Sequence, residues 1–98
     1  MLIKIIKGYR NIVAICDSDL IGRKFEQGKF QLDLTGTFFK GKEVSEKEAI
    51  KIIQNMQKED ATFNIVGQKS INTAVKAEII LEKGIKKIQG VPFALLLL

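Results

Sequence analysis

The sequence predicts an α+β domain in which a small mixed or mainly antiparallel sheet packs against two main helices. Runs of β-branched residues lie toward both ends of the chain, and two amphipathic helical patterns with clear start signals lie in its second half. The chain has 98 residues, of which 46% are hydrophobic. A chain of this length folds around one hydrophobic core, because it cannot divide its buried surface between two. We therefore expect residues 1–98 to form a single compact domain.

The N-terminal segment predicts a hairpin followed by one helical turn. Leu2–Lys7 and Asn11–Cys16 are β-branched runs, and the residues between them match the connection of an antiparallel hairpin. Asp17–Gly22 then provides a capping aspartate, a single turn and a glycine stop. A longer helix is not expected there.

The middle of the chain predicts a strand, a loop and a first helix. Lys29–Thr35 alternates apolar and polar side chains, which is typical of a half-buried strand. Residues 36–44 contain two glycines and are of mixed polarity, so we expect a loop. Ser45 and Glu48 have the spacing of a capping box, and the helix that they begin should run to about Gln57. Its buried stripe is expected to comprise Ala49, Ile52, Ile53 and Met56.

The last third of the chain predicts a strand, a second helix and further strands. Thr62–Val66 has strand character, and Gly67 allows a sharp turn into a helix that ends near Gly84. Ile85–Gln89 and Val91–Leu98 should follow as two strands or one bent strand. Three lysines recur every seven residues and should lie along one outer line of the second helix: Lys69, Lys76 and Lys83.

The side chains that are present argue against an enzyme. Histidine is absent, which removes the commonest general base and metal ligand. Cys16 lies at a strand end, where a lone cysteine is more typical of a small buried group than of a reactive thiol. Asp17 is already explained as a helix cap, and its spacing from Asp19 and Glu43 matches no known cation-binding loop. We expect no metal and no cofactor.

The balance of charge favours an anionic partner. Sixteen Lys and Arg against eleven Asp and Glu give a net charge of +5, which suits RNA. The amides of residues 68–70, which follow Gly67, would hold one phosphate together with Lys69 at the helix start. Position 62 is threonine where a nucleotide-binding P-loop requires glycine, so we do not expect that motif. The alternative is that these lysines only form the solvent-exposed face of the second helix and bind no partner.

Two segments combine aromatic and basic side chains, which together can stack a base and neutralise its phosphate. The segment Phe38–Lys42 lies on the predicted loop, and one of its two phenylalanines is expected in the core. The second segment lies at the tip of the N-terminal hairpin. The residues that we expect to contact RNA are therefore Tyr9, Arg10, Phe39, Lys40, Lys42, Lys69 and Lys76.

Four segments, taken as a set, carry a family resemblance. They are Cys16–Asp17 with Leu20 and Gly22, Phe38–Phe39 with Gly41, Asn64–Gly67 with Ile71 and Ala74, and Gly90–Pro92. With these segments the chain resembles the archaeal family called domain of unknown function 424, over nearly its whole length. The resemblance implies a compact cytoplasmic α+β protein associated with translation genes, and it makes Cys16, Asp17, Asn64 and Gly67 further candidate site positions.

The chain departs from the pattern of that family at two positions. Phe93 stands where relatives are expected to have histidine, so any chemistry or RNA contact of that histidine is lost here. An apolar packing or assembly role for Phe93 is favoured in its place. Lys42 replaces an acidic residue, which makes its loop more basic.

These observations predict a non-enzymatic, cytoplasmic accessory protein that binds RNA or a ribonucleoprotein, mainly at phosphates. The alternative is an interaction module that forms a homodimer through Phe93–Leu98, which is apolar on both faces. An enzyme that uses Cys16, or Asp17 with Asp19, is the least favoured class. No membrane contact is expected, because the longest apolar run, Val91–Leu98, is far below the roughly 20 residues that cross a bilayer as a helix.

Overall fold

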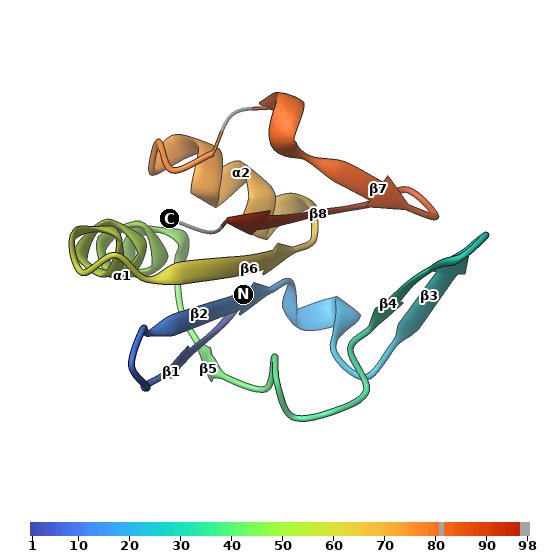
Figure 1. Cartoon of the computed structure of the whole chain (residues 1–98), viewed down its shortest axis with the longest axis horizontal. Helices are drawn as coiled ribbons and strands as arrows, with labels where there is room; N and C mark the ends of the chain where they lie inside the picture. The colour runs from blue at the N-terminus through green and yellow to red at the C-terminus, as the bar shows by residue number, and fades with distance from the viewer. Residues whose placement is uncertain (81, 97–98) are drawn as a thin grey trace.

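A mixed sheet of six strands carries two α-helices on one face, as the predicted α+β class requires (Figure 1). The computed structural model describes residues 1–80 and 82–96. The strand order is β5-β1-β2-β6-β8-β7, and the central neighbours β2 and β6 run parallel while the other pairs are antiparallel. The bounds of the six strands are β1 Leu2–Ile6, β2 Ile12–Cys16, β5 Lys42–Glu43, β6 Thr62–Val66, β7 Lys86–Ile88 and β8 Val91–Leu96.

The N-terminal hairpin forms as predicted. β1 pairs with β2 so that Ile3 lies opposite Ile15. Val13 and Ile15 of β2 belong to the core beneath the helices, whereas Ala14 and Cys16 point to the other face. Because β2 is buried on both faces, its sequence is continuously apolar, which is typical of a strand at the centre of a sheet.

The first helix, α1 (Glu46–Lys58), also forms as predicted. The backbone N–H of Glu48 donates to the side-chain oxygen of Ser45 over 3.2 Å, which caps the helix. Ala49, Ile53 and Met56 face the sheet and are buried. The predicted stripe therefore packs α1 on the core.

The second helix, α2 (Gln68–Lys76), is shorter than the sequence suggests. It does not reach Gly84, because Glu78, which follows the C-cap residue Ala77, adopts a positive φ of 62° and turns the chain inward. This turn places Ile79 and Ile80 in the core. The predicted line of three lysines is therefore wrong, since Lys83 lies in a separate 3₁₀ turn, η2 (Glu82–Gly84).

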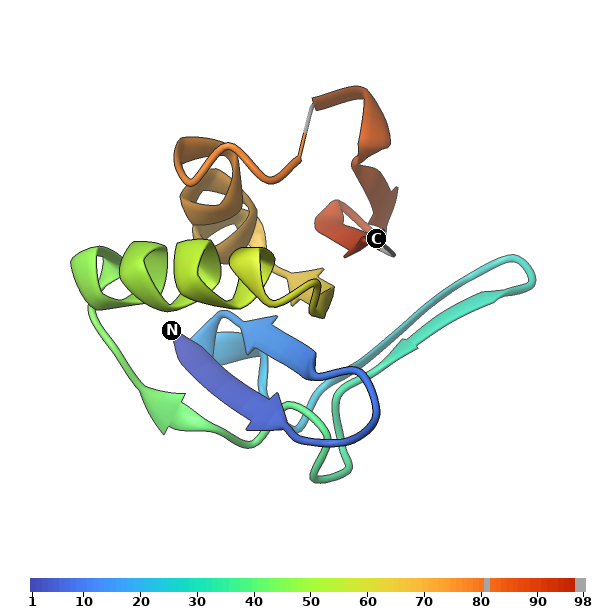
Figure 2. The ribbon, with the colours of Figure 1, turned by 60° about the vertical axis from the view of Figure 1, so that its left-hand side comes forward.

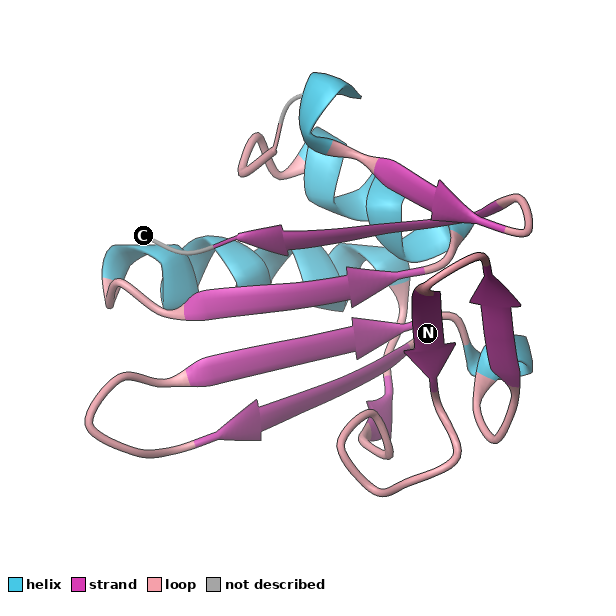
Figure 3. Cartoon of the chain, turned by 45° about the vertical axis from the view of Figure 1, so that its right-hand side comes forward, coloured by secondary structure: helices cyan, strands magenta, loops and turns pink. Residues whose placement is uncertain are grey.

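A second, smaller layer covers part of the other face of the sheet. The predicted helical turn forms as η1 (Ser18–Leu20), and a two-stranded hairpin of β3 (Lys24–Gln27) and β4 (Phe30–Asp33) follows it and extends away from the end of the main sheet (Figure 2, Figure 3). β3 was not predicted, and Phe30 of β4 is 70% exposed at the hairpin tip. The core between this layer and the sheet comprises Ala14, Cys16, Leu20, Phe25, Leu34, Phe39, Val66 and Ile88.

The C-terminal strand β8 lies inside the sheet between β6 and β7. Its pairing with β6 covers Phe93–Leu96, whereas β7 pairs only with Val91–Phe93. The remainder of the predicted C-terminal strand, residues 97–98, lies outside the described residues. No helix in the described part of the chain is long and apolar enough to cross a membrane.

Candidate nucleic-acid interface

Asp17 occupies the start of α2, although 50 residues separate the two in sequence. Its buried carboxylate accepts hydrogen bonds from the backbone N–H of Lys69 over 3.1 Å and of Ser70 over 2.8 Å, and from the Ser70 hydroxyl over 2.7 Å. The predicted phosphate site at residues 68–70 is therefore wrong, since this carboxylate already satisfies two of its amides. Asp17 does cap a helix, but the helix is α2, because it makes no side-chain cap on the turn that follows it.

Gly67 is required by the same contact. Its φ of 106° lies in a region that favours glycine, and an added Cβ would lie 2.3 Å from the carboxyl carbon of Asp17. Gly67 also donates its backbone N–H to the carbonyl of Pro92 over 2.8 Å, which ties the turn to β8. These two candidate positions therefore have structural roles in seating α2.

Cys16 is buried, and its thiol donates to the carbonyl of Asp17 over 3.2 Å. Burial, followed by the negative charges of Asp17 and Asp19, raises the pKa of Cys16 from 9.0 to about 12. At neutral pH the sulfur is therefore a protonated thiol, which is a poor nucleophile.

The carboxylates that were considered for a cation do not converge. Glu43 accepts a hydrogen bond from the Ser18 hydroxyl over 2.5 Å and forms an ion pair with the N-terminal ammonium. These two hydrogen bonds, the ammonium first, lower the pKa of Glu43 below its usual value of 4.5, and the charge of Lys69 adds to the effect. Among the described residues, no group of three Asp, Glu or Cys side chains is arranged to hold a metal.

The aromatic loop supplies one exposed ring, and it is not the predicted one. Phe39 is 9% exposed and packs in the second core, so it cannot serve as a platform for a base. Phe38 is 39% exposed and meets Phe39 edge-on at 5.0 Å between ring centroids. Lys40 and Lys42 on the same segment are exposed. The loop therefore still combines an exposed aromatic ring with exposed lysines, but the exposed ring is Phe38 and the buried one is Phe39.

Tyr9 and Arg10 lie apart from the other predicted contact residues. They precede β2, whereas the contact of Asp17 with Ser70 lies at the opposite end of that strand. Tyr9 is fully exposed, and both residues line a shallow depression together with Glu59 and Asp60. The structure therefore does not bring the hairpin tip together with the lysines of α2.

The lysines near α2 differ in their ionic partners. Lys76 reaches across to Glu46 of α1 over 2.7 Å, which neutralises much of its charge. Lys69, Lys40 and Lys42 form no ion pair with a carboxylate that the structure describes. Their charges face solvent and remain available to an anionic partner.

Asn64 lies on β6 between Ala14 of β2 and Leu95 of β8. It is half-buried on the sheet face opposite the helices, because its neighbours Phe63 and Ile65 belong to the core beneath them. This candidate position therefore points away from the side of the sheet on which α2 packs.

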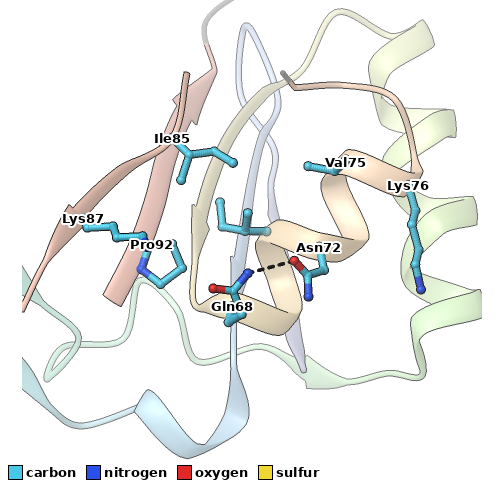
Figure 4. Close-up of a pocket in the computed structure, with 8 residues that line it drawn as sticks. Gln68, Asn72, Val75, Lys76, Ile85, Lys87 and Pro92 are labelled. Carbon is cyan, nitrogen blue, oxygen red and sulfur yellow. Dashed lines mark hydrogen bonds between the residues drawn. The ribbon is translucent and has the colours of Figure 1, made fainter. Parts of the chain in front are cut away.

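A groove beside α2 was not predicted from the sequence. It has a volume of about 490 Å³ and runs between α2 and the strands β7 and β8 (Figure 4). One wall of the groove comes from α2, and the other comes from residues near β7 and from Pro92. Because these segments are apart in sequence, the lining residues come together only in the folded chain. The lining residues are Gln68, Ile71, Asn72, Val75, Lys76, Ile85, Lys87 and Pro92.

Comparisons with known proteins place this geometry among uncharacterised relatives. Residues 6–98 match the model of a family described as "Protein of unknown function (DUF424)". An uncharacterized conserved protein from Methanopyrus kandleri has a similar crystal structure, with a TM-score of 0.86 and 26% sequence identity over 97% of this chain and 88% of that one. A comparison with curated proteins gave no match.

Proposed function

We propose that this chain, which belongs to the DUF424 family of proteins of unknown function, is a non-enzymatic accessory protein that binds RNA or a ribonucleoprotein. The binding surface, which we call the α2 basic surface, comprises Lys40, Lys42, Lys69, Lys76 and Lys87. Its contacts are mainly to phosphates, so it carries little sequence information. The assignment extends to a translation-associated RNA through the family resemblance alone.

This proposal rests on the observation that most lysines of the α2 basic surface are not neutralised by a carboxylate. The net charge is +5, and four of these five lysines have no ion pair with a described carboxylate. The nearby Glu43 is engaged by the N-terminal ammonium and by Ser18, so it opposes their charge only weakly. Unpaired surface lysines bind phosphates and release counterions from the nucleic acid.

The absence of an enzymatic role is supported by the two groups that would have carried one. The thiol of Cys16 is enclosed and protonated. Both carboxylate oxygens of Asp17 accept hydrogen bonds from α2. Neither group is free to act on a substrate.

A salt titration tests the proposal. We expect the affinity for a fluorescent single-stranded RNA, measured by anisotropy, to fall steeply between about 50 and 200 mM salt. The triple variant Lys40→Gln, Lys42→Gln, Lys69→Gln should bind more weakly and should reduce the slope against log salt by about 2, at roughly 0.7 for each lost phosphate contact. The control variant Lys51→Gln, Lys58→Gln changes exposed lysines of α1 and should retain the slope. Absence of binding at low salt, or equal losses in the two variants, would refute the proposal.

Self-association through β8 is a second candidate function, and one observation favours it. Among the strands that the structure describes, β7 pairs with β8 only at Val91–Phe93 and none pairs with Ala94–Leu96 on that side, and Leu95 is 60% exposed. An open strand edge with an exposed apolar side chain is a template for pairing with a second copy. Light scattering should then give a dimer whose population rises with concentration and is lost in Leu95→Lys. A monomer at all concentrations rules this function out.

A further inference from the structure

We infer that the groove between α2 and β7–β8 receives one unpaired nucleotide of the bound RNA, with its base between the walls and its phosphate beside Lys87. This inference rests on the proposed function and specifies its ligand. The groove has a volume of about 490 Å³, which lies in the range of small-molecule sites of roughly 300–1,000 Å³.

The walls of the groove suit the two faces of a base. Val75 comes from α2, whereas Ile85 and Pro92 come from the strand side (Figure 4). Ile71, also of α2, completes the apolar lining. All four are aliphatic; Ile71 and Pro92 are buried at the base of the groove, and Val75 and Ile85 are half-buried. A nucleobase is flat with two weakly polar faces, so its insertion between Val75 and Ile85 would remove apolar surface from water. A base inside a duplex has both faces covered by its stacked neighbours, so this slot requires an unpaired base.

The polar end of the groove suits the edge of a base. The side-chain amide of Gln68 donates to the side-chain oxygen of Asn72 over 2.8 Å, and this contact fixes both groups in orientation (Figure 4). Gln68 keeps its carbonyl oxygen as an acceptor, and Asn72 keeps its amide N–H groups as donors. An acceptor beside a donor matches every nucleobase, because each base presents adjacent donor and acceptor atoms on its edge. The groove should therefore accept any base with little selectivity.

The charge at the groove suits a single phosphate. Lys76 is ion-paired with Glu46, whereas Lys87 is exposed and has no ion pair with a described carboxylate. The pair contributes no net charge, so the groove carries one uncompensated positive charge. A phosphodiester carries one negative charge, which Lys87 can neutralise.

A second groove of nearly equal size differs from the groove beside α2 in the residues that line it. It has a volume of about 500 Å³ and lies between the solvent side of α1 and the end of α2. It also contains amides, including Gln54 and Asn55, and lysines, but Ala77 is its single apolar lining residue and Glu78 adds a negative charge. It therefore lacks the apolar walls for a base, whereas its two lysines and one glutamate leave a net positive charge like that of the first groove, so it provides a matched control.

The first experiment compares two pairs of amide-to-leucine changes. Gln68→Leu with Asn72→Leu removes the polar end of the groove but retains bulk on exposed positions of α2, whereas Gln54→Leu with Asn55→Leu makes the same change on α1. The groove variant should bind single-stranded RNA about tenfold more weakly at fixed salt, with an unchanged salt slope because no phosphate contact is lost. The α1 variant should bind like the wild type.

Duplex RNA and a mononucleotide complete the test. The groove variant should bind a duplex as well as the wild type does, because a paired base does not enter the slot. Titration with adenosine monophosphate should shift the methyl NMR signals of Ile71, Val75 and Ile85, and Lys87→Gln should weaken that titration. Equal affinity of the two amide variants, or methyl shifts confined to other sites, would overturn the inference. If those results accompany salt-dependent RNA binding, the groove assignment fails alone; if RNA does not bind at all, the proposed function fails with it.

Discussion

At the scale of single residues, one carboxylate determines the geometry of two turns. Asp17 directly follows β2 and at the same time satisfies amides at the start of α2. Its carboxylate fills the space where Gly67 would carry a side chain. From the sequence, Asp17 was predicted to cap the turn that follows it, and Gly67 was predicted to allow the turn into the second helix. The contact between them spans 50 residues, so it cannot be inferred from local sequence pattern.

A double-mutant cycle tests this contact. We expect Asp17→Ala to lower the free energy of unfolding by about 2–4 kcal/mol, because it leaves buried amides and the Ser70 hydroxyl without a partner. Gly67→Ala should cost about 2 kcal/mol or more in the wild type, through the clash and the strained φ. Its cost should be smaller by about 1 kcal/mol in the Asp17→Ala background, where the clash is gone. Urea unfolding measures all four proteins, and strict additivity would contradict the proposed contact.

The buried thiol gives a prediction about pH. The pKa of Cys16 is about 12 in the folded chain and 9.0 when the thiol is solvated, so folding favours the protonated form. The resulting stabilisation is complete below pH 9 and is lost as the pH rises toward 12. Wild type should therefore lose stability above pH 9 more steeply than Cys16→Ala does, as measured by urea midpoints across this range. Iodoacetamide at pH 8 should modify the thiol in urea and leave it unmodified in the native protein.

At the scale of elements, the sequence predicted where helices begin more reliably than where they end. Ser45 and Glu48 identify the start of α1 because a capping box acts within one turn. The end of α2 was missed because Ile79 continues the apolar period, although the chain has already turned at Glu78. β3 was missed because it has one buried residue, Phe25, and its strand conformation depends on pairing with β4.

The end of α2 can be tested at Glu78. A residue with φ of 62° directly after a helix favours glycine, and Glu78 is exposed. We expect Glu78→Gly to be more stable than Glu78→Ala by about 1 kcal/mol, because both variants remove the same charge and differ in backbone strain. Thermal unfolding of the two variants measures this difference. Equal melting temperatures would show that the helix does not end in this conformation.

At the scale of the whole molecule, the fold class was predictable and the location of function was not. Apolar periodicity and turn residues identify a sheet with two helices, since these signals are local. The groove depends on Ile71 and Val75 lying opposite Ile85 and Pro92, and only the strand order brings these segments together. Lys69 and Lys76 were predicted as contacts from charge, but the ion pair of Lys76 with Glu46 joins two helices and has no local signal.

The parallel pairing of β2 with β6 has a consequence for protein synthesis. These strands form the centre of the sheet, yet Cys16 lies opposite Val66, so two-thirds of the chain must leave the ribosome before they can meet. A hairpin of two strands is marginal in water on its own, and closing so long a loop costs entropy before any contact repays it. Val13 and Ile15 therefore remain uncovered during most of translation, and the nascent N-terminal half is the segment that a ribosome-associated chaperone would have to shield.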